Sequence, residues 1–235
     1  DYYVAVSYGN DHNNATSISS PFKTIAKAST LMSSGDICYI RQGRYHETIS
    51  IDNLNGSSGS AIIFTNYNNE KVVMDGTVPI NSLWTQIGST NVWRTKLSSD
   101  IWQLFVNWEE QVMARWPNAK FSDDTIWDND NYWARGTIDD DENAYTNGTI
   151  IDKPFTNSQG TTIDLSATGF DLDENNKQAI AILNLGSFRT WSRFVTGHSG
   201  NTINYSTVPN WKTKHHYYYL EGRREFLDQV GEWWY

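Results

Sequence analysis

SSPFKTIAKASTLMSSGDICYIRQGRYHETISI, residues 19–51, is the stretch that decides the fold. Ser20–Pro21 is typical of a helix start, with serine as the N-cap and proline at the first helical position. The apolar and small residues that follow repeat at helical spacing: Phe22, Ile25, Ala26, Ser29 and Met32. Gly35 predicts the end of this helix, and Ile37–Ile40 predicts a short strand after it.

The spacing of the predicted strands indicates a solenoid. The strands that begin at Ile37 and Ala61 start 24 residues apart, a plausible length for one coil. A terminal coil would expose an apolar end and open strand edges, and an amphipathic helix laid over it would cover both. An ordinary βα unit fits the same spacing, so spacing alone leaves both interpretations open.

Motifs along the chain resemble those of right-handed parallel β-helix proteins that act on polysaccharides, as glycoside hydrolases or lyases. The matching segments are Gly9–Asp11, Ser20–Ile25, Gly35–Glu47, Ala61–Phe64, Val72–Gly76, Leu104–Asn118 and Leu220–Tyr235. Trp108 departs from this pattern, because the family has glycine there, and it suggests a different turn. The resemblance implies an all-β chain: the start of a right-handed parallel β-helix with an N-terminal capping helix, plus an antiparallel, sandwich-like insertion.

The strand pattern changes near residue 80 and indicates three regions. Leu83–Ile87 and Val92–Thr95 flank a Gly/Ser/Asn turn, which is typical of a β-hairpin. We therefore expect the cap and first coils in residues 1–80. The antiparallel insertion, with a long loop rich in Asp, Asn and Trp, would occupy residues 81–220. Residues 221–235 would return toward the β-helix. In the family the β-helix continues beyond this motif, so we expect an incomplete unit here. Its partner at this end would be the remainder of a larger polypeptide or another chain.

Composition narrows the class of protein. The chain has 18 Lys and Arg against 27 Asp and Glu, and its net charge of −9 argues against nucleic acid as a partner. It has no apolar run long enough to span a bilayer. Its 11 Trp and 13 Tyr, in a background of Asn, Ser and Thr, fit a secreted, extracellular or cell-surface bacterial protein that binds polysaccharide. Many of these rings would also pack against β-sheets.

Two groups of residues are candidates for glycan binding. Each combines a tryptophan ring, for contact with a sugar face, with planar donors for hydroxyl groups or for uronate or sulfate charge. The first group is Arg115, Trp116 and Asn118, and the second is Arg189, Trp191 and Arg193. The alternative is that both tryptophans belong to the core and that Arg115 holds its own loop.

Calcium is the one cofactor for which the sequence offers candidate ligands. Hard cations are bound by several carboxylate and amide oxygens, often from one loop. The candidates are Asp128, Asp130, Asp139, Asp140 and Asp141. Solvated loops are the alternative interpretation. Asp171–Asn175 copies the start of an EF-hand loop, but the glycine and the final glutamate that such a loop requires are replaced by Asn176 and Ile182.

Two functions follow from these patterns. The first is the N-terminal portion of a secreted polysaccharide-degrading β-helix enzyme, a hydrolase or a lyase. In the family the catalytic residues lie on later coils, so none is assigned to a position here. A pair of carboxylates or a Lys or Arg base would serve such chemistry, and neither is singled out among the 27 acidic and 18 basic residues. The second is a non-catalytic extracellular glycan-binding, adhesin or surface-assembly protein of the same fold.

Overall fold

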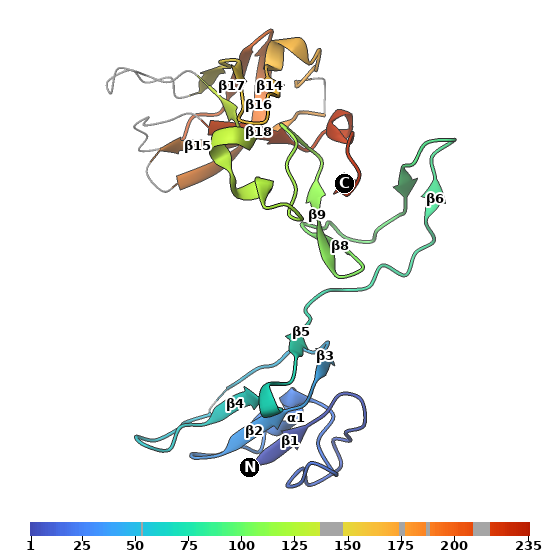
Figure 1. The fold of residues 1–235 in the computed structure, drawn as a ribbon, viewed down its shortest axis with the longest axis vertical. Helices are drawn as coiled ribbons and strands as arrows, with labels where there is room; N and C mark the ends of the chain where they lie inside the picture. Colours follow the sequence, from blue (N-terminus) through green and yellow to red (C-terminus); the bar gives the residue numbers. More distant parts are fainter. Residues whose placement is uncertain (53, 137–147, 174–176, 187–188, 209–216) are drawn as a thin grey trace. The chain divides into compact units, whose positions relative to one another are not determined.

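The computed structural model describes residues 1–52, 54–136, 148–173, 177–186, 189–208 and 217–235 (Figure 1). The chain divides into two compact units, Asp1–Leu97 (unit 1) and Ser98–Tyr235 (unit 2). Both consist mainly of short strands with a few short helices, which confirms an all-β chain. No helix in the described part of the chain is long and apolar enough to cross a membrane.

Unit 1 is built on two parallel ladders. Its elements are β1 (Tyr2–Val4), α1 (Ile25–Ser29), β2 (Ile37–Ile40), β3 (Gly43–Tyr45), β4 (Ile63–Asn66), η1 (Tyr67–Asn69), β5 (Val72–Met74), β6 (Thr85–Gln86) and β7 (Trp93–Arg94). One sheet has the order β1-β2-β4, and β3 pairs with β5 in the other. The pairing of Ile37 with Ile63 confirms the predicted parallel alignment of these strands, at a spacing of 26 residues. The predicted hairpin is also confirmed, because β6 and β7 are antiparallel.

The helix of unit 1 is shorter than predicted and begins later. Thr24, and not Ser20, is its N-cap, and the Thr24 hydroxyl accepts a hydrogen bond from the Lys27 amide. The reason is that Phe22 forms a parallel bridge with Val4, so Pro21 cannot open the helix. The carboxylate of Glu47 accepts the amides of Ile25 and Ala26, which satisfies two of the free N–H groups of the first turn.

The core of unit 1 lies between α1 and the parallel strands. Its buried members are Val4, Ala15, Phe22, Ile25, Ala28, Met32, Cys38, Ile40 and Tyr45. Gly9 closes the loop before the helix, and its amide donates to the carbonyl of Ala5. A Cβ atom at Gly9 would lie 2.1 Å from the carbonyl oxygen of Phe22, so only glycine fits at this position.

Unit 2 begins with a hairpin and contains a large antiparallel sheet. Its elements are β8 (Leu104–Val106), β9 (Glu109–Met113), β10 (Arg115–Trp116), η2 (Thr125–Trp127), α2 (Asn129–Tyr132), β11 (Ala134–Arg135), β12 (Thr149–Ile151), β13 (Phe155–Thr156), β14 (Thr162–Ile163), η3 (Leu165–Ala167), β15 (Ile180–Gly186), β16 (Arg189–Ser199), β17 (Thr202–Tyr205), β18 (Tyr217–Glu221), η4 (Arg224–Phe226) and β19 (Glu232–Trp233). The sheet has the order β10-β18-β15-β16-β17-β12, and β11 also pairs with β18. A separate three-stranded sheet contains β19, β9 and β8, with β19 parallel to β9.

Two local predictions for unit 2 need correction. The turn between β8 and β9 has positive φ at both Asn107 and Trp108, 52° and 72°. Trp108 therefore adopts the backbone that favours glycine, although its side chain predicted a different turn. The segment predicted as a long loop contains the short elements η2, α2 and β11. Residues 137–147 of this segment lie outside the described residues.

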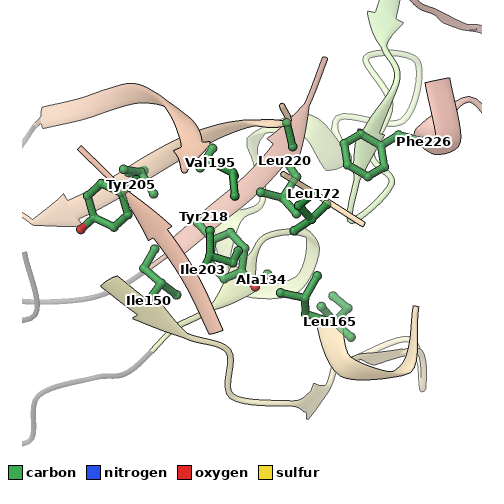
Figure 2. Close-up of a cluster of buried hydrophobic side chains, with 14 of the residues drawn as sticks. Ala134, Ile150, Leu165, Leu172, Val195, Ile203, Tyr205, Tyr218, Leu220 and Phe226 are labelled. Carbon is green, nitrogen blue, oxygen red and sulfur yellow. The ribbon is translucent and has the colours of Figure 1, made fainter. Parts of the chain in front are cut away.

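One face of the large sheet covers the core of unit 2. Val195, Tyr218 and Leu220, from β16 and β18, belong to one buried cluster (Figure 2). Along β16, Trp191 packs against this cluster, whereas the alternating residues Thr190, Ser192 and Phe194 are exposed. Exposure thus alternates along β16 with the two-residue period of a strand, and the sheet has a core face and an open face.

Candidate functional site

Arg115, the first glycan-binding candidate, lies inside unit 2 with only 2% of its surface exposed. Its Nε donates to the carbonyl of Pro117 at 2.9 Å, and its Nη2 donates to the carbonyl of Tyr132 at 3.0 Å. Burial lowers the pKa of the guanidinium to about 10. The donors of Arg115 thus hold the backbone of its own unit, the role that the sequence offered as the alternative, and they do not face solvent.

Trp116 and Asn118 also make contacts within unit 2. The half-buried Trp116 ring lies 6.3 Å from the ring centre of Tyr218 and 6.4 Å from that of Phe170. The side-chain amide of Asn118 donates to a carboxylate oxygen of Asp228 at 2.9 Å. Both placements favour a structural role for this first group of candidates.

The second group lies on β16. The half-buried Trp191 packs against the core, and the guanidinium carbon of Arg193 is 5.5 Å from the centre of its ring. Nε of Arg193 donates to the carbonyl of Ser206, while Arg189 is exposed at the start of the strand. Since β18 and β15 separate β10 from β16, the sheet does not bring the two groups together.

The calcium candidates that the structure describes have protein partners. Asp128 caps α2 by accepting the amide and the side-chain amide of Asn131. Asp130 accepts the hydroxyl of Tyr217 at 2.7 Å. Asp139, Asp140 and Asp141 lie outside the described residues. In the described ranges, no group of three or more His, Cys, Asp or Glu side chains could hold a metal ion.

A row of paired residues crosses the open face of the large sheet, and the sequence did not show that these residues are neighbours. Phe194 pairs with Ile180, Ile180 pairs with Glu221, and Glu221 pairs with Arg115. This row crosses four neighbouring strands. Phe194 is 60% exposed at one end, whereas Arg115 is buried at the other. Burial raises the pKa of Glu221, which the nearby Arg115 partly opposes.

An open hollow of about 980 Å³ lies at the Phe194 end of this row, within unit 2. Four exposed aromatic side chains line it: Trp102 (85% exposed), Phe194 (60%), Trp234 (46%) and Tyr235 (56%). The hydroxyl of Tyr235 donates to Asp100 at 2.6 Å, which joins two segments of the wall. Exposed apolar rings gathered in one concave site are typical of a ligand-binding surface.

Charged side chains also line the hollow. The buried Arg223 donates through Nε to Glu225 at 2.9 Å and through Nη1 to the carbonyl of Lys177. The hydrogen bond from Arg223 lowers the pKa of Glu225. Lys177 and Arg224 are exposed beside this pair. The lining can hold a ligand that presents an apolar face to the rings and polar groups to the charged side chains.

Sequence reasoning missed the hollow because its lining comes from six separate segments, four of which show the problem. Trp102 precedes β8, Phe194 lies on β16, Arg224 begins η4, and Tyr235 follows β19. One signal was present: strand alternation placed Phe194 on the face opposite Val195, and Val195 is core.

Comparison with known proteins leaves the family open. No family model matches the chain. It is 41% identical over 76 residues to the uncharacterized protein YwoF of Bacillus subtilis, a match of 32% of this chain to 16% of the relative's length. The chain thus corresponds to only a small part of that relative. Among solved structures, the complex of XylC with xylose aligns with 95% of this chain and 32% of its own, at 19% identity and a TM-score of 0.36.

Proposed function

We propose that this chain belongs to a secreted, bacterial, polysaccharide-degrading β-helix protein and that unit 2 binds the glycan. The observation that carries the binding role is the hollow, which is lined by four exposed aromatic rings together with charged side chains. Ring faces suit the C–H faces of sugars, and the neighbouring charged groups suit hydroxyl groups. In this proposal the hollow is the glycan-binding site, in place of the candidate groups around Trp116 and Trp191.

The β-helix part of the proposal is supported by the order of pairing in unit 1. β2 and β3 follow each other in the chain and pair in parallel with β4 and β5, respectively. Two successive stretches therefore each supply one strand to both ladders, as the coils of a parallel solenoid do. In this proposal residues 1–80 form the cap and first coils, residues 81–220 the insertion, and residues 221–235 the return. The parallel pairing of β19 with β9 supports a return of the chain to parallel strand pairing near residue 232.

Within the described residues, the carboxylates of the hollow favour binding over cleavage in this part of the protein. Asp100 accepts the hydroxyl of Tyr235, and Glu225 is paired with Arg223. The hydrogen bond from Arg223 lowers the pKa of Glu225 and keeps it ionised, whereas a general acid must be protonated, so Glu225 does not suit that role. We propose that the remainder of a larger polypeptide supplies the catalytic residues. A wholly non-catalytic glycan-binding or surface-assembly protein is the second candidate, and the same observation favours it.

A polysaccharide panel tests the proposal. Affinity electrophoresis of the 235-residue chain in gels that contain neutral or acidic polysaccharides measures binding, and we expect retardation by at least one of them. Assays for new reducing ends and for the ultraviolet absorbance of unsaturated ends separate hydrolase, lyase and binding protein. A repeat with EDTA tests whether calcium, held by the acidic segment 128–141, contributes. Migration unchanged by every polysaccharide would refute the glycan-binding role.

A further inference from the structure

The net charge of the side chains that line the hollow is opposite in sign to the net charge of the whole chain. The chain carries a net charge of −9. The lining of the hollow nevertheless includes three cationic side chains and two anionic ones: Lys177, Arg223 and Arg224, and Asp100 and Glu225. The hollow is therefore a cationic site on an acidic protein.

Both anionic side chains already interact with other residues of the protein. Arg223 neutralises Glu225 through an ion pair, and Asp100 accepts the hydroxyl of Tyr235. Lys177 and Arg224 are exposed, and neither forms a contact ion pair in the described ranges, although the charge of Lys177 helps to lower the pKa of Glu225. Their two charges are the ones that a ligand would meet beside the aromatic rings.

We infer that the hollow binds an acidic glycan, with Lys177 and Arg224 facing its carboxylate or sulfate groups and Trp102 and Phe194 contacting its sugar rings. This inference rests on the proposed glycan-binding role and adds the class of ligand. Arginine and lysine bind such anions through charge-assisted hydrogen bonds. A neutral glycan would offer these two cations no charge of its own, and a protein partner would have to carry an acidic patch of matching shape.

A pair of ligands that differ only in charge tests the inference. Polygalacturonate carries a carboxylate on every residue, and its methyl ester has the same sugar rings without that charge. We expect the chain to bind polygalacturonate at least about tenfold more tightly at low salt and to lose most of this preference near about 0.5 M NaCl, where charges are screened.

Variants assign the effect to the hollow. Arg224→Gln and Lys177→Gln should each weaken binding of polygalacturonate about fivefold and leave binding of the ester unchanged. Arg189→Gln removes the same charge from an exposed residue of unit 2 outside the hollow and should change neither. Trp102→Ser should weaken binding of both ligands, because this exposed ring is not part of the core. Circular dichroism verifies that each variant is folded.

The possible outcomes separate the inference from the function on which it rests. Equal affinity for polygalacturonate and its ester, or equal effects of Arg189→Gln and Arg224→Gln, would overturn the acidic specificity while keeping glycan binding. No binding of either ligand, together with no retardation across the polysaccharide panel, would overturn both. Sedimentation that reveals a dimer abolished by Trp102→Ser would assign the hollow to a second copy of the chain and overturn both as well.

Discussion

The guanidinium carbon of Arg115 lies 3.7 Å from the centre of the Tyr219 ring. This cation–π contact joins β10 to β18 inside unit 2, while the other guanidinium donors bind the carbonyls of Pro117 and Tyr132. Burial raises the pKa of the Tyr219 hydroxyl to about 12, so the ring stays neutral beside the cation. One buried side chain thus links three segments of the chain.

Removal of the Arg115 side chain should therefore destabilise unit 2. Arg115→Ala leaves two backbone carbonyls without donors and the Tyr219 ring without its cation, and we expect a loss of about 3 kcal/mol in the free energy of unfolding. Urea denaturation measures this loss. Arg189→Ala, at an exposed position, should change the free energy by less than about 0.5 kcal/mol. A similar loss from both substitutions would contradict the buried role of Arg115.

Glu221 should give unit 2 a pH-dependent stability. Burial raises its pKa above the ordinary value of 4.5. A carboxyl group with a raised pKa in the folded state contributes stability that is present below 4.5 and is lost as pH rises through the folded pKa. Wild type should therefore lose stability relative to Glu221→Gln as pH rises through that range. Urea denaturation of both proteins across the acidic range measures the difference, and a difference that is constant with pH would exclude this titration.

Gly9 should tolerate no side chain. A Cβ atom there would lie 2.1 Å from the Phe22 carbonyl oxygen and 2.5 Å from that of Ala5, both backbone atoms. Gly9→Ala should lower the free energy of unfolding of unit 1 by about 2 kcal/mol or more. Gly76→Ala is the matched control, because a Cβ at Gly76 meets no atom within 4 Å. Hydrogen exchange of β1 and β2 measures both effects, and equal exchange in the two variants would contradict the clash.

Cys38 should report the unfolding of unit 1. Its side chain is buried in the core, and burial raises the pKa of the thiol to about 12. The thiolate is the reactive form, so alkylation by iodoacetamide near neutral pH should be at least about a hundredfold slower in the native protein than in urea. Cys38 is the one cysteine of the sequence, so mass spectrometry measures its labelling directly. Labelling at equal rates in both conditions would place the thiol at the surface.

Local patterns predicted β2 and β4 of unit 1, but they missed β3 and placed the start of the helix too early. Apolar runs and glycine turns located β2, and the spacing to the next apolar run located its parallel partner β4. The helix boundary failed because the bridge between Phe22 and Val4 is a long-range contact. Helical periodicity and a favourable Ser-Pro start contain no information about that bridge.

The candidate site was predictable only in part. The two-residue alternation of a strand puts Phe194 and the core residue Val195 on opposite faces of β16. The approach of Trp102 and Tyr235 to that face depends on the pairing of β19 with β9 and on the bond from Tyr235 to Asp100. Neither interaction leaves a pattern in the local sequence. The local sequence likewise could not show whether Trp191, which has an arginine two positions away on each side, contacts a ligand or packs against the core.

The sheet order of unit 2 sets the time at which it can be completed during synthesis. β10 pairs with β18, and the paired residues Arg115 and Glu221 are 106 positions apart. In unit 1 the most distant paired strands, β1 and β2, join residues only 36 positions apart. A ribosome adds residues one at a time, and a strand can pair only after its partner has emerged. The N-terminal ladders can therefore form while β10 still lacks its neighbour, and the buried Arg115 must wait for Tyr219 to be translated.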